Sequence, residues 1–172
     1  MNELLNDLIE SVKSHYTVLH VDYPKSGQVA LDLPPREVHA VLAFLKAQGY
    51  RQLSMLSCVD WITDGQFQLV YLLFNWDAGL RLQVRTRIDR AHPEFTTVTG
   101  IYPGAKYYER DVHEFFGVAF AGNPDSGKPL FLEKWDDLPP MRKDFDPQAY
   151  SDRKYPARQY KADFDTKAGE VQ

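Results

Sequence analysis

Residues able to bind a metal ion or transfer protons gather in one short stretch, which contains Glu109, Asp111, His113 and Glu114. On a helix, Glu109 and His113 are one turn apart and share a face, so they could supply two ligands to a metal such as zinc. A zinc site needs further ligands, and the other histidines offer no second pair. We therefore favour a structural role, with Glu109 and Arg110 in buried or interfacial ion pairs. The alternative is a free-standing metal-dependent or acid–base enzyme that uses Glu109, His113 and Glu114.

Two further candidate sites carry weaker signals. The stretch Gly122–Pro129 is close to a phosphate-binding loop, but Pro129 stands where such a loop needs a hydroxyl side chain and a backbone N–H. The sequence therefore argues against nucleotide binding there. Cys58 is the one cysteine and lies in an apolar run, which predicts a small buried side chain rather than a nucleophile. A single cysteine also excludes an intrachain disulfide and an all-cysteine metal or iron–sulfur site.

The composition is that of an ordinary globular chain. It has 172 residues, of which 44% are hydrophobic and 26% charged, and a net charge of −4, which argues against a nucleic-acid binder. No apolar run approaches the ~20 residues of a membrane span, and the N-terminus has no signal-peptide pattern. We expect a soluble protein of a reducing compartment. The aromatic content of 13% is high, which is typical either of an aromatic-rich core or of protein interfaces.

Hydrophobic periodicity predicts a regular arrangement of helices and strands up to about residue 116. Helices are expected at 3–12, from Pro34-Pro35 to Gly49, and near 102–116. Strands are expected at 16–22, 28–33, 52–62, 67–76 and 80–89, the first two forming a hairpin. The strand at 67–76 is apolar on both faces, which predicts that it is covered on both sides.

One expected strand carries a basic stripe. In the segment 80–89, Arg81, Gln83, Arg85 and Arg87 share the face opposite the leucines. No aromatic residues interrupt this stripe, as an RNA-binding platform would need, so we predict a solvated or protein-facing sheet surface. The order of elements predicts an α+β fold with a mixed or antiparallel sheet and helices packed on one face.

The pattern changes after Gly117. Residues 118–172 show no sustained period, and aromatic residues recur among the many charges of residues 133–167. A disordered tail would be poor in aromatics, so we predict two regions: an α+β domain at 1–120 and an extended C-terminal arm at 121–172 that packs on partner subunits. The alternative is that the arm folds back on its own sheet.

Two linked motifs resemble the signature of the 30 kDa subunit family of respiratory complex I, which is the family of the C subunit of NADH–quinone oxidoreductase. They are Tyr107–Val118 and Pro140–Phe145, with Trp135 between them at the matching place. The segment Cys58–Trp61 and the strand after it also lie where the family's sheet would place them. The resemblance covers nearly the whole chain.

The resemblance implies a subunit of the peripheral arm of a membrane-bound redox complex, on the cytoplasmic face of the cell membrane. It implies no redox cofactor in this chain, with iron–sulfur clusters and a quinone or nickel–iron site in partner subunits. The implied partners are the 49 kDa-like large subunit and iron–sulfur subunits. On this basis we predict no catalytic residue and the following partner-binding residues: Glu109, Arg110, Asp111, Gly117, Trp135, Arg142, Lys143, Asp144, Phe145, Tyr150, Tyr155 and Tyr160.

The sequence departs from the family pattern at several positions. Asp111 stands where the pattern has glutamate, and His113-Glu114 replaces an aromatic–aspartate pair. Asn123-Pro124 and Pro139-Pro140 stand where complex I commonly has histidine–proline pairs. These variants look more like the equivalent subunits of membrane-bound energy-converting hydrogenases, toward which we lean.

Overall fold

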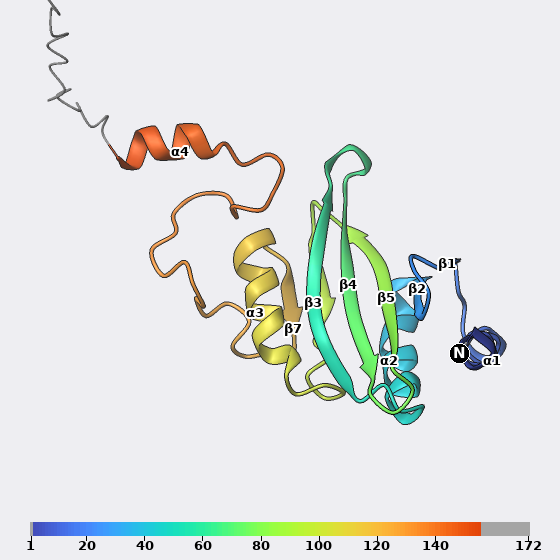
Figure 1. Cartoon of the computed structure of the whole chain (residues 1–172). Helices are drawn as coiled ribbons and strands as arrows, with labels where there is room; N and C mark the ends of the chain where they lie inside the picture. Colours follow the sequence, from blue (N-terminus) through green and yellow to red (C-terminus); the bar gives the residue numbers. More distant parts are fainter. Residues whose placement is uncertain (1, 156–172) are drawn as a thin grey trace, which may run out of the picture.

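A five-stranded mixed sheet is the centre of the computed structural model, which describes residues 2–155 (Figure 1). Its strand order is β1-β2-β5-β4-β3. The strands are β1 (His20–Asp22), β2 (Gln28–Leu33), β3 (Gln52–Trp61), β4 (Gln66–Asn75) and β5 (Leu80–Asp89). All pairs are antiparallel except β2–β5, which is parallel. The α+β class and the mixed sheet are confirmed.

The helices lie close to the predicted ranges. They are α1 (Asn2–His15), α2 (Val38–Ala47), α3 (Ala105–Phe116) and α4 (Pro147–Lys154), with short 3₁₀ turns at Pro35–Glu37 and Ile62–Asp64. None of the described helices has the length and hydrophobicity needed to cross a membrane. A small parallel pair, β6 (Glu94–Thr96) and β7 (Ala119–Ala121), was not predicted, because strands of three residues leave no periodic signal.

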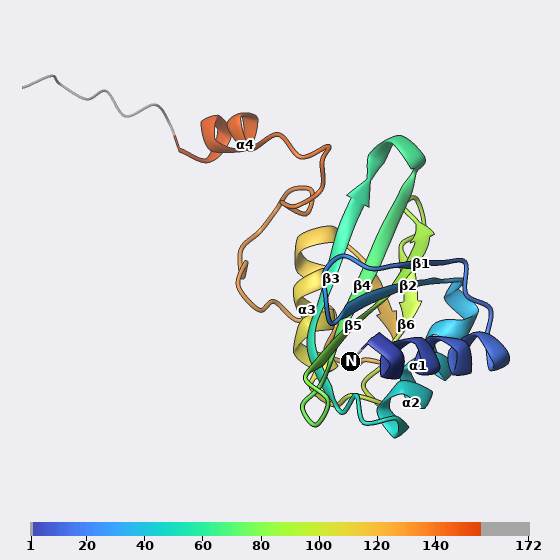
Figure 2. The same cartoon turned by 45° about the vertical axis from the view of Figure 1, so that its right-hand side comes forward.

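One face of the large sheet forms the core with three helices. Phe67 of β4 meets Phe116 of α3 edge-on at 6.1 Å, and Tyr71 contacts Phe95, which stacks on His39 of α2. The buried face of α1 joins the same core beyond β2 (Figure 2). Packing of the helices on one face is confirmed.

The expectation that β4 is covered on both sides is wrong. Phe67, Leu69, Tyr71 and Leu73 are buried, but the residues between them are partly exposed. No described element covers the outer face of β4, so its apolar residues there are shielded only by neighbouring side chains. The predicted strand at 16–22 is likewise shorter, because α1 extends to His15 and pairing begins at His20.

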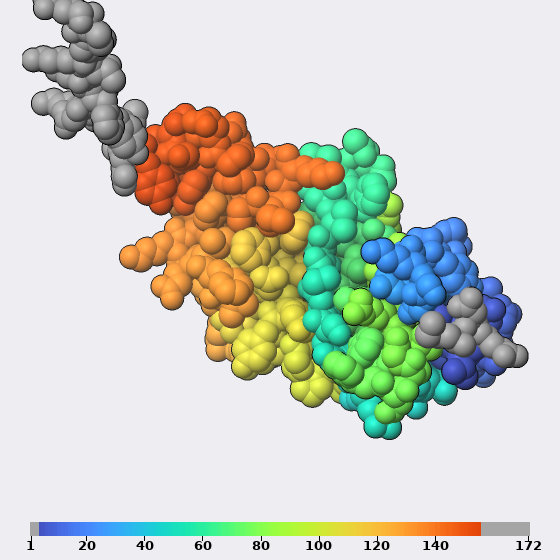
Figure 3. Space-filling model, viewed as in Figure 1, coloured from blue at the N-terminus to red at the C-terminus, as the bar shows by residue number. Residues whose placement is uncertain are grey.

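The arm leaves α3, passes along it and returns to the end of the β3–β4 hairpin. Figure 3 shows the orange residues of the arm lying against the yellow α3 and the teal hairpin. Apart from α4, residues 122–155 contain no helix or strand. The predicted boundary at 120/121 falls inside β7 and remains a prediction.

Candidate partner-binding site

Five residues tie the arm to the sheet. Asp60 binds Arg90 through two hydrogen bonds, Nε to Oδ1 at 2.8 Å and Nη2 to Oδ2 at 3.1 Å. The backbone N–H of Lys143 donates to Oδ2 of Asp60 at 2.8 Å. Arg90 also pairs with Asp144 at 2.8 Å, and Arg142 binds Asp144 through two bonds of 3.1 Å. We call Asp60, Arg90, Arg142, Lys143 and Asp144 the arm anchor.

The arm anchor is largely removed from water. The side chain of Asp60 is 1% exposed and that of Arg90 is 13% exposed. Both arginines also lie over the ring of Phe67, with guanidinium carbons 5.4 Å (Arg90) and 5.7 Å (Arg142) from its centroid. Buried, two-pronged arginine–carboxylate pairs are strong and fix direction, so the anchor determines where the arm leaves the sheet.

The carboxylates of the anchor stay ionised to low pH. Burial opposes the ionisation of Asp60, but the hydrogen bonds from Arg90 and from the N–H of Lys143 outweigh it and lower its pKa. Hydrogen bonds from Arg142 hold the pKa of Asp144 far below its usual value, against its partial burial. The anchor therefore carries its charges throughout the neutral range.

Cys58 lies two residues before Asp60 on the same inner face. It is 5% exposed, and burial, with a smaller effect of the Asp60 charge, raises its pKa to about 12. The prediction of a small buried side chain is confirmed.

Glu109 is fully buried and is bound by neutral donors. Its carboxylate accepts hydrogen bonds from Thr97 Oγ1 at 2.7 Å, the N–H of Val98 at 2.8 Å and Asn123 Nδ2 at 2.8 Å. These contacts fasten α3 to the segments before and after it. Among the described residues Glu109 forms no ion pair, so that expectation is wrong.

Arg110 binds the arm rather than an acid. Its guanidinium donates to the backbone carbonyls of Lys128 and Pro129. No described carboxylate pairs with it, and an interfacial ion pair with a partner stays a prediction. Asp111 next to it is partly buried, and burial and the nearby Glu114 charge raise its pKa. Arg110 thus holds the first part of the arm against α3.

Glu114 and His113 also contact the chain's own backbone. The Glu114 carboxylate accepts from three successive N–H groups, those of residues 130, 131 and 132, at 2.6–3.2 Å. His113 donates from Nδ1 to the carbonyl of Val118 at 2.9 Å. Glu109, His113 and Glu114 thus have separate partners, and no three acid, histidine or cysteine residues in the described part are placed to hold a metal ion.

Gly117 ends α3 in the left-handed conformation, with φ 83°. Its N–H donates to the carbonyl of His113 at 2.8 Å, and an added Cβ would lie 3.3 Å from Pro139. Only glycine adopts this conformation without strain, so Gly117 permits the close approach of the arm to α3.

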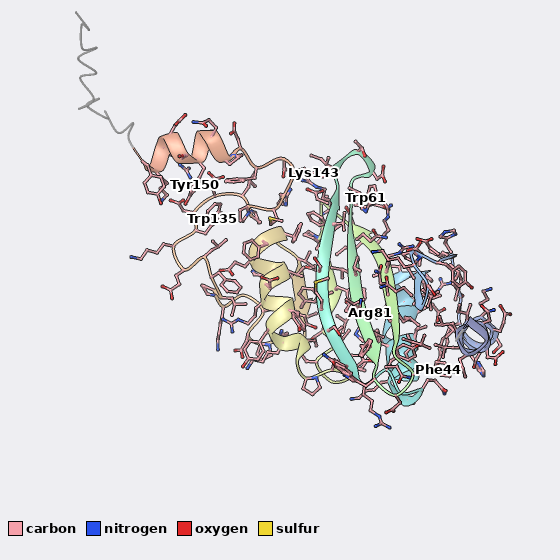
Figure 4. All side chains as sticks on the ribbon, in the orientation of Figure 1. Phe44, Trp61, Arg81, Trp135, Lys143 and Tyr150 are labelled. Atoms are coloured by element: carbon pink, nitrogen blue, oxygen red, sulfur yellow. The ribbon has the colours of Figure 1, made fainter. Side chains whose placement is uncertain are left out.

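Three predicted partner-binding aromatics pack on one another. Trp135 stacks on Tyr150 at 4.4 Å, and Phe145 contacts both at 5.3 and 5.8 Å (Figure 4). Ion pairs of Arg153 and Lys154 with Asp136 and Asp137 surround this cluster. Tyr155 is 68% exposed. Tyr160 lies outside the described residues.

The structure thus combines both interpretations of the arm. Arg142, Lys143 and Asp144 bind the chain's own sheet, while exposed apolar side chains remain along the arm: Phe131, Leu138, Met141 and Tyr155. Their contact with a partner stays a prediction. The sequence interpretation missed Asp60 and Arg90 as anchor residues. A signal existed for Asp60, whose position in the alternation of β3 points inward; nothing marks Arg90.

The chain is an α+β domain whose arm is bound to the sheet and exposes apolar side chains. These features are typical of proteins that assemble with other chains. The family of the respiratory-chain NADH dehydrogenase 30 kDa subunit matches residues 31–151, and this chain belongs to that family. The match includes α3 and the whole arm anchor.

Relatives and solved structures agree with this family. The chain is 35% identical over 132 residues to the mitochondrial NADH-ubiquinone oxidoreductase 30.4 kDa subunit of Neurospora crassa, covering 74% of this chain and 46% of that protein. It is 32% identical to the C subunit of NADH-quinone oxidoreductase from Moorella thermoacetica, covering 67% of this chain and 78% of that one. The chain thus spans about half of the fungal relative and most of the bacterial one.

Two solved structures have the same fold. A chain of the membrane-bound sulfane sulfur reductase, an archaeal respiratory membrane complex, matches with TM-score 0.79 and 32% identity over 89% of this chain and 92% of that one. A trypsin-resistant fragment (1–134) of Nqo5 matches with TM-score 0.60 and 29% identity, covering 71% and 98%. The archaeal match extends over more of this chain than the Nqo5 fragment does.

Proposed function

We propose that this chain is a non-catalytic structural subunit in the peripheral arm of a membrane-bound, ion-translocating redox complex. It binds the 49 kDa-like large subunit and supports electron transfer between cofactors held by partners: iron–sulfur clusters and a quinone or nickel–iron site. It lies on the cytoplasmic face of the membrane through the complex. Membership of the 30 kDa subunit family and the likeness to a chain of an archaeal respiratory membrane complex support this proposal.

One structural observation carries the proposal: the arm is held against α3 and the sheet, yet large apolar side chains along it are exposed to water. Phe131 is 68% exposed and Met141 is 58% exposed, and Met141 immediately precedes the anchor. An arm held in one direction loses less entropy when it binds, because its path is already set. Exposed apolar groups on such a segment favour docking to another protein.

The type of complex follows from its other subunits. The departures at Asp111 and at His113-Glu114 favour the hydrogenase-type relatives, and the archaeal likeness supports a complex other than NADH–quinone oxidoreductase. We therefore propose an energy-converting hydrogenase-like complex ahead of the NADH–quinone type.

Gentle detergent extraction of the tagged full chain, followed by mass spectrometry of what it retains, tests the proposal. We expect a large subunit and iron–sulfur subunits. A large subunit with nickel-binding cysteines would assign the hydrogenase type, and one without them beside flavin and NADH subunits the NADH–quinone type. Recovery of the chain alone would overturn the proposal.

A matched pair of variants links the result to the arm. Met141→Asp places a charge on the exposed apolar surface, and we expect it to reduce recovery of the large subunit about tenfold or more. Ser151→Asp adds the same charge on the exposed face of α4 without removing an apolar group, and should leave recovery unchanged. Equal recovery with both variants would remove the arm from the interface.

A further inference from the structure

Two charged side chains of α3 bind the backbone of one loop of the arm, residues 128–132. Arg110 donates to the carbonyls of residues 128 and 129. Glu114, one helical turn further along, accepts from the N–H groups of the next three residues at 2.6–3.2 Å. Hydrogen bonds to charged groups are stronger than those between neutral groups, and successive N–H groups form a natural anion-binding hollow. We call Arg110 and Glu114 the loop clamp, because together they contact the main chain of five successive residues.

Phe131 lies in the middle of the N–H groups that Glu114 binds. Its own N–H contacts both oxygens of the carboxylate, at 2.9 and 3.2 Å, so its backbone is fixed from two directions. The residue is nevertheless 68% exposed. The loop clamp therefore fixes the position of a large apolar side chain that the described part of the chain leaves mostly uncovered.

Phe115 of α3 joins this loop to the other exposed apolar part of the arm. Its ring lies 6.2 Å from the ring of Phe131, and its carbonyl accepts from the N–H of Met141 at 3.0 Å. Met141 is itself 58% exposed. Two exposed apolar residues, ten positions apart in the chain, are thus held around one residue of α3.

We infer that Arg110 and Glu114 are positioning residues for partner binding, and that Phe131 is the contact residue that they position. The partner offers an apolar recess to the Phe131 ring and is the same subunit that covers Met141. Aromatic residues and methionine are enriched in protein interfaces, and a backbone that is fixed before binding loses less entropy when it binds. The inference rests on the proposed function in one respect: the partner is the subunit of the complex that binds the arm.

The place of the loop in the chain favours a subunit of the complex as the partner. Residues 128–132 lie within 31–151, the range that matches the family of the respiratory-chain NADH dehydrogenase 30 kDa subunit. The loop also continues the arm surface that carries Met141, because both contact Phe115. A second copy of the chain and residues 156–172 are the other candidates, and crosslinking distinguishes them.

Amide hydrogen exchange in the tagged full chain tests the loop clamp. Glu114→Ala removes the acceptor of the N–H groups of residues 130–132, so these three amides should exchange about tenfold faster or more. Glu133→Ala is the matched control: it removes an exposed carboxylate next to the loop and should leave their exchange unchanged. Unchanged exchange in Glu114→Ala, or equal acceleration in both variants, would overturn the inference.

Recovery of the complex with the tagged full chain tests the positioning. We expect Phe131→Ala to reduce recovery of the partner subunit about tenfold, and Glu114→Ala to reduce it about threefold or more. In a chain that already carries Phe131→Ala, Glu114→Ala should cause no further loss, because the side chain that it positions is gone. A further loss of the same size would show general damage to the fold and overturn the inference.

The same experiment separates this inference from the proposed function. If the wild-type chain recovers its partner and Phe131→Ala does so equally well, the inference fails and the proposed function stands. If the wild-type chain recovers no partner, both fail.

A photo-crosslinking aromatic residue in place of Phe131 identifies what covers this position in the complex. We expect a crosslink to an apolar segment of the subunit that binds the arm. A crosslink to residues 156–172, a crosslink to a second copy of the chain, or no crosslink would each overturn the inference.

Discussion

The backbone N–H of Lys143 donates a 2.8 Å hydrogen bond to Asp60, a carboxylate that precedes it by 83 residues. The same carboxylate binds Arg90, which in turn holds Asp144. Two motifs that are far apart in the chain are therefore joined at one buried charge. The geometry of the arm depends on this junction.

Replacing Asp60 by Asn should destabilise the protein strongly. It leaves the guanidinium of Arg90 buried with only Asp144, and breaking a buried pair costs about 3–5 kcal/mol in the free energy of unfolding. Urea denaturation measures this loss, and limited proteolysis should cut the arm near Lys143 faster. Asp64→Asn is the control: Asp64 pairs with Arg87 on the surface, and we expect a loss below about 1 kcal/mol. Similar losses in both variants would contradict the anchor.

The anchor should weaken only in acid. The pKa values of Asp60 and Asp144 are lowered in the folded chain, so the unfolded chain takes up protons first as the pH falls. The stability that they contribute is complete above the unfolded pKa of about 4 and is lost as the pH drops below it. The difference in unfolding free energy between wild type and Asp60→Asn should therefore stay constant from pH 7 to about 5 and shrink below about 4. If the difference in unfolding free energy already shrinks near pH 6, another titrating group is responsible for the pH dependence.

Glu109→Gln should lower the free energy of unfolding, because Glu109 has a structural role. An amide in place of the carboxylate turns an N–H₂ group toward a donor, either the N–H of Val98 or Asn123, and an unsatisfied buried group costs about 1–3 kcal/mol. Thermal or urea unfolding measures this loss. Glu10→Gln, which affects an exposed pair with Lys13, should change stability by less than about 1 kcal/mol. Wild-type stability with loss of the redox activity of the complex would instead favour a chemical role for Glu109.

Two truncations separate the anchor from α4. A chain ending at Phe145 keeps the anchor and loses a helix with no buried residues, so its sheet domain should retain wild-type stability while recovery of the complex falls. A chain ending at Pro139 also loses the N–H of Lys143 that binds Asp60 and the carboxylate of Asp144 that binds Arg90, and should be less stable by about 1–3 kcal/mol. Urea denaturation compares the two. If the chain that ends at Phe145 unfolds, α4 belongs to the core.

Local patterns predicted most of the fold. The alternation at 80–89 matches the bounds of β5, and the positions of Arg81, Arg85 and Arg87 on the outer face follow from it. Each of these features depends on residues close in sequence, and the period of a strand or helix is visible there. The two short strands β6 and β7 were missed because each is too short to show a period.

The candidate site was predicted only in part. Gly117 lies at a turn that needs glycine, and the arm residues Arg142 and Asp144 do form a charged cluster. Within the described residues Glu109 binds neutral donors and Arg110 binds backbone carbonyls, so neither forms the expected ion pair inside the chain, and an interfacial pair of Arg110 stays a prediction. Sequence spacing gives the face that a residue occupies but not the groups that face it from other elements.

The sequence by itself determined the elements, the inward and outward faces of the strands, and the resemblance to a family of subunits. Those properties depend on residue types and short spacings. Only the tertiary structure decided that Asp60, Arg90 and Asp144 meet, and that the arm is fastened to the sheet while its apolar side chains stay exposed. The reason is physical: the pairing of these charges depends on how β3, β5 and the arm are placed in space, which no local period specifies.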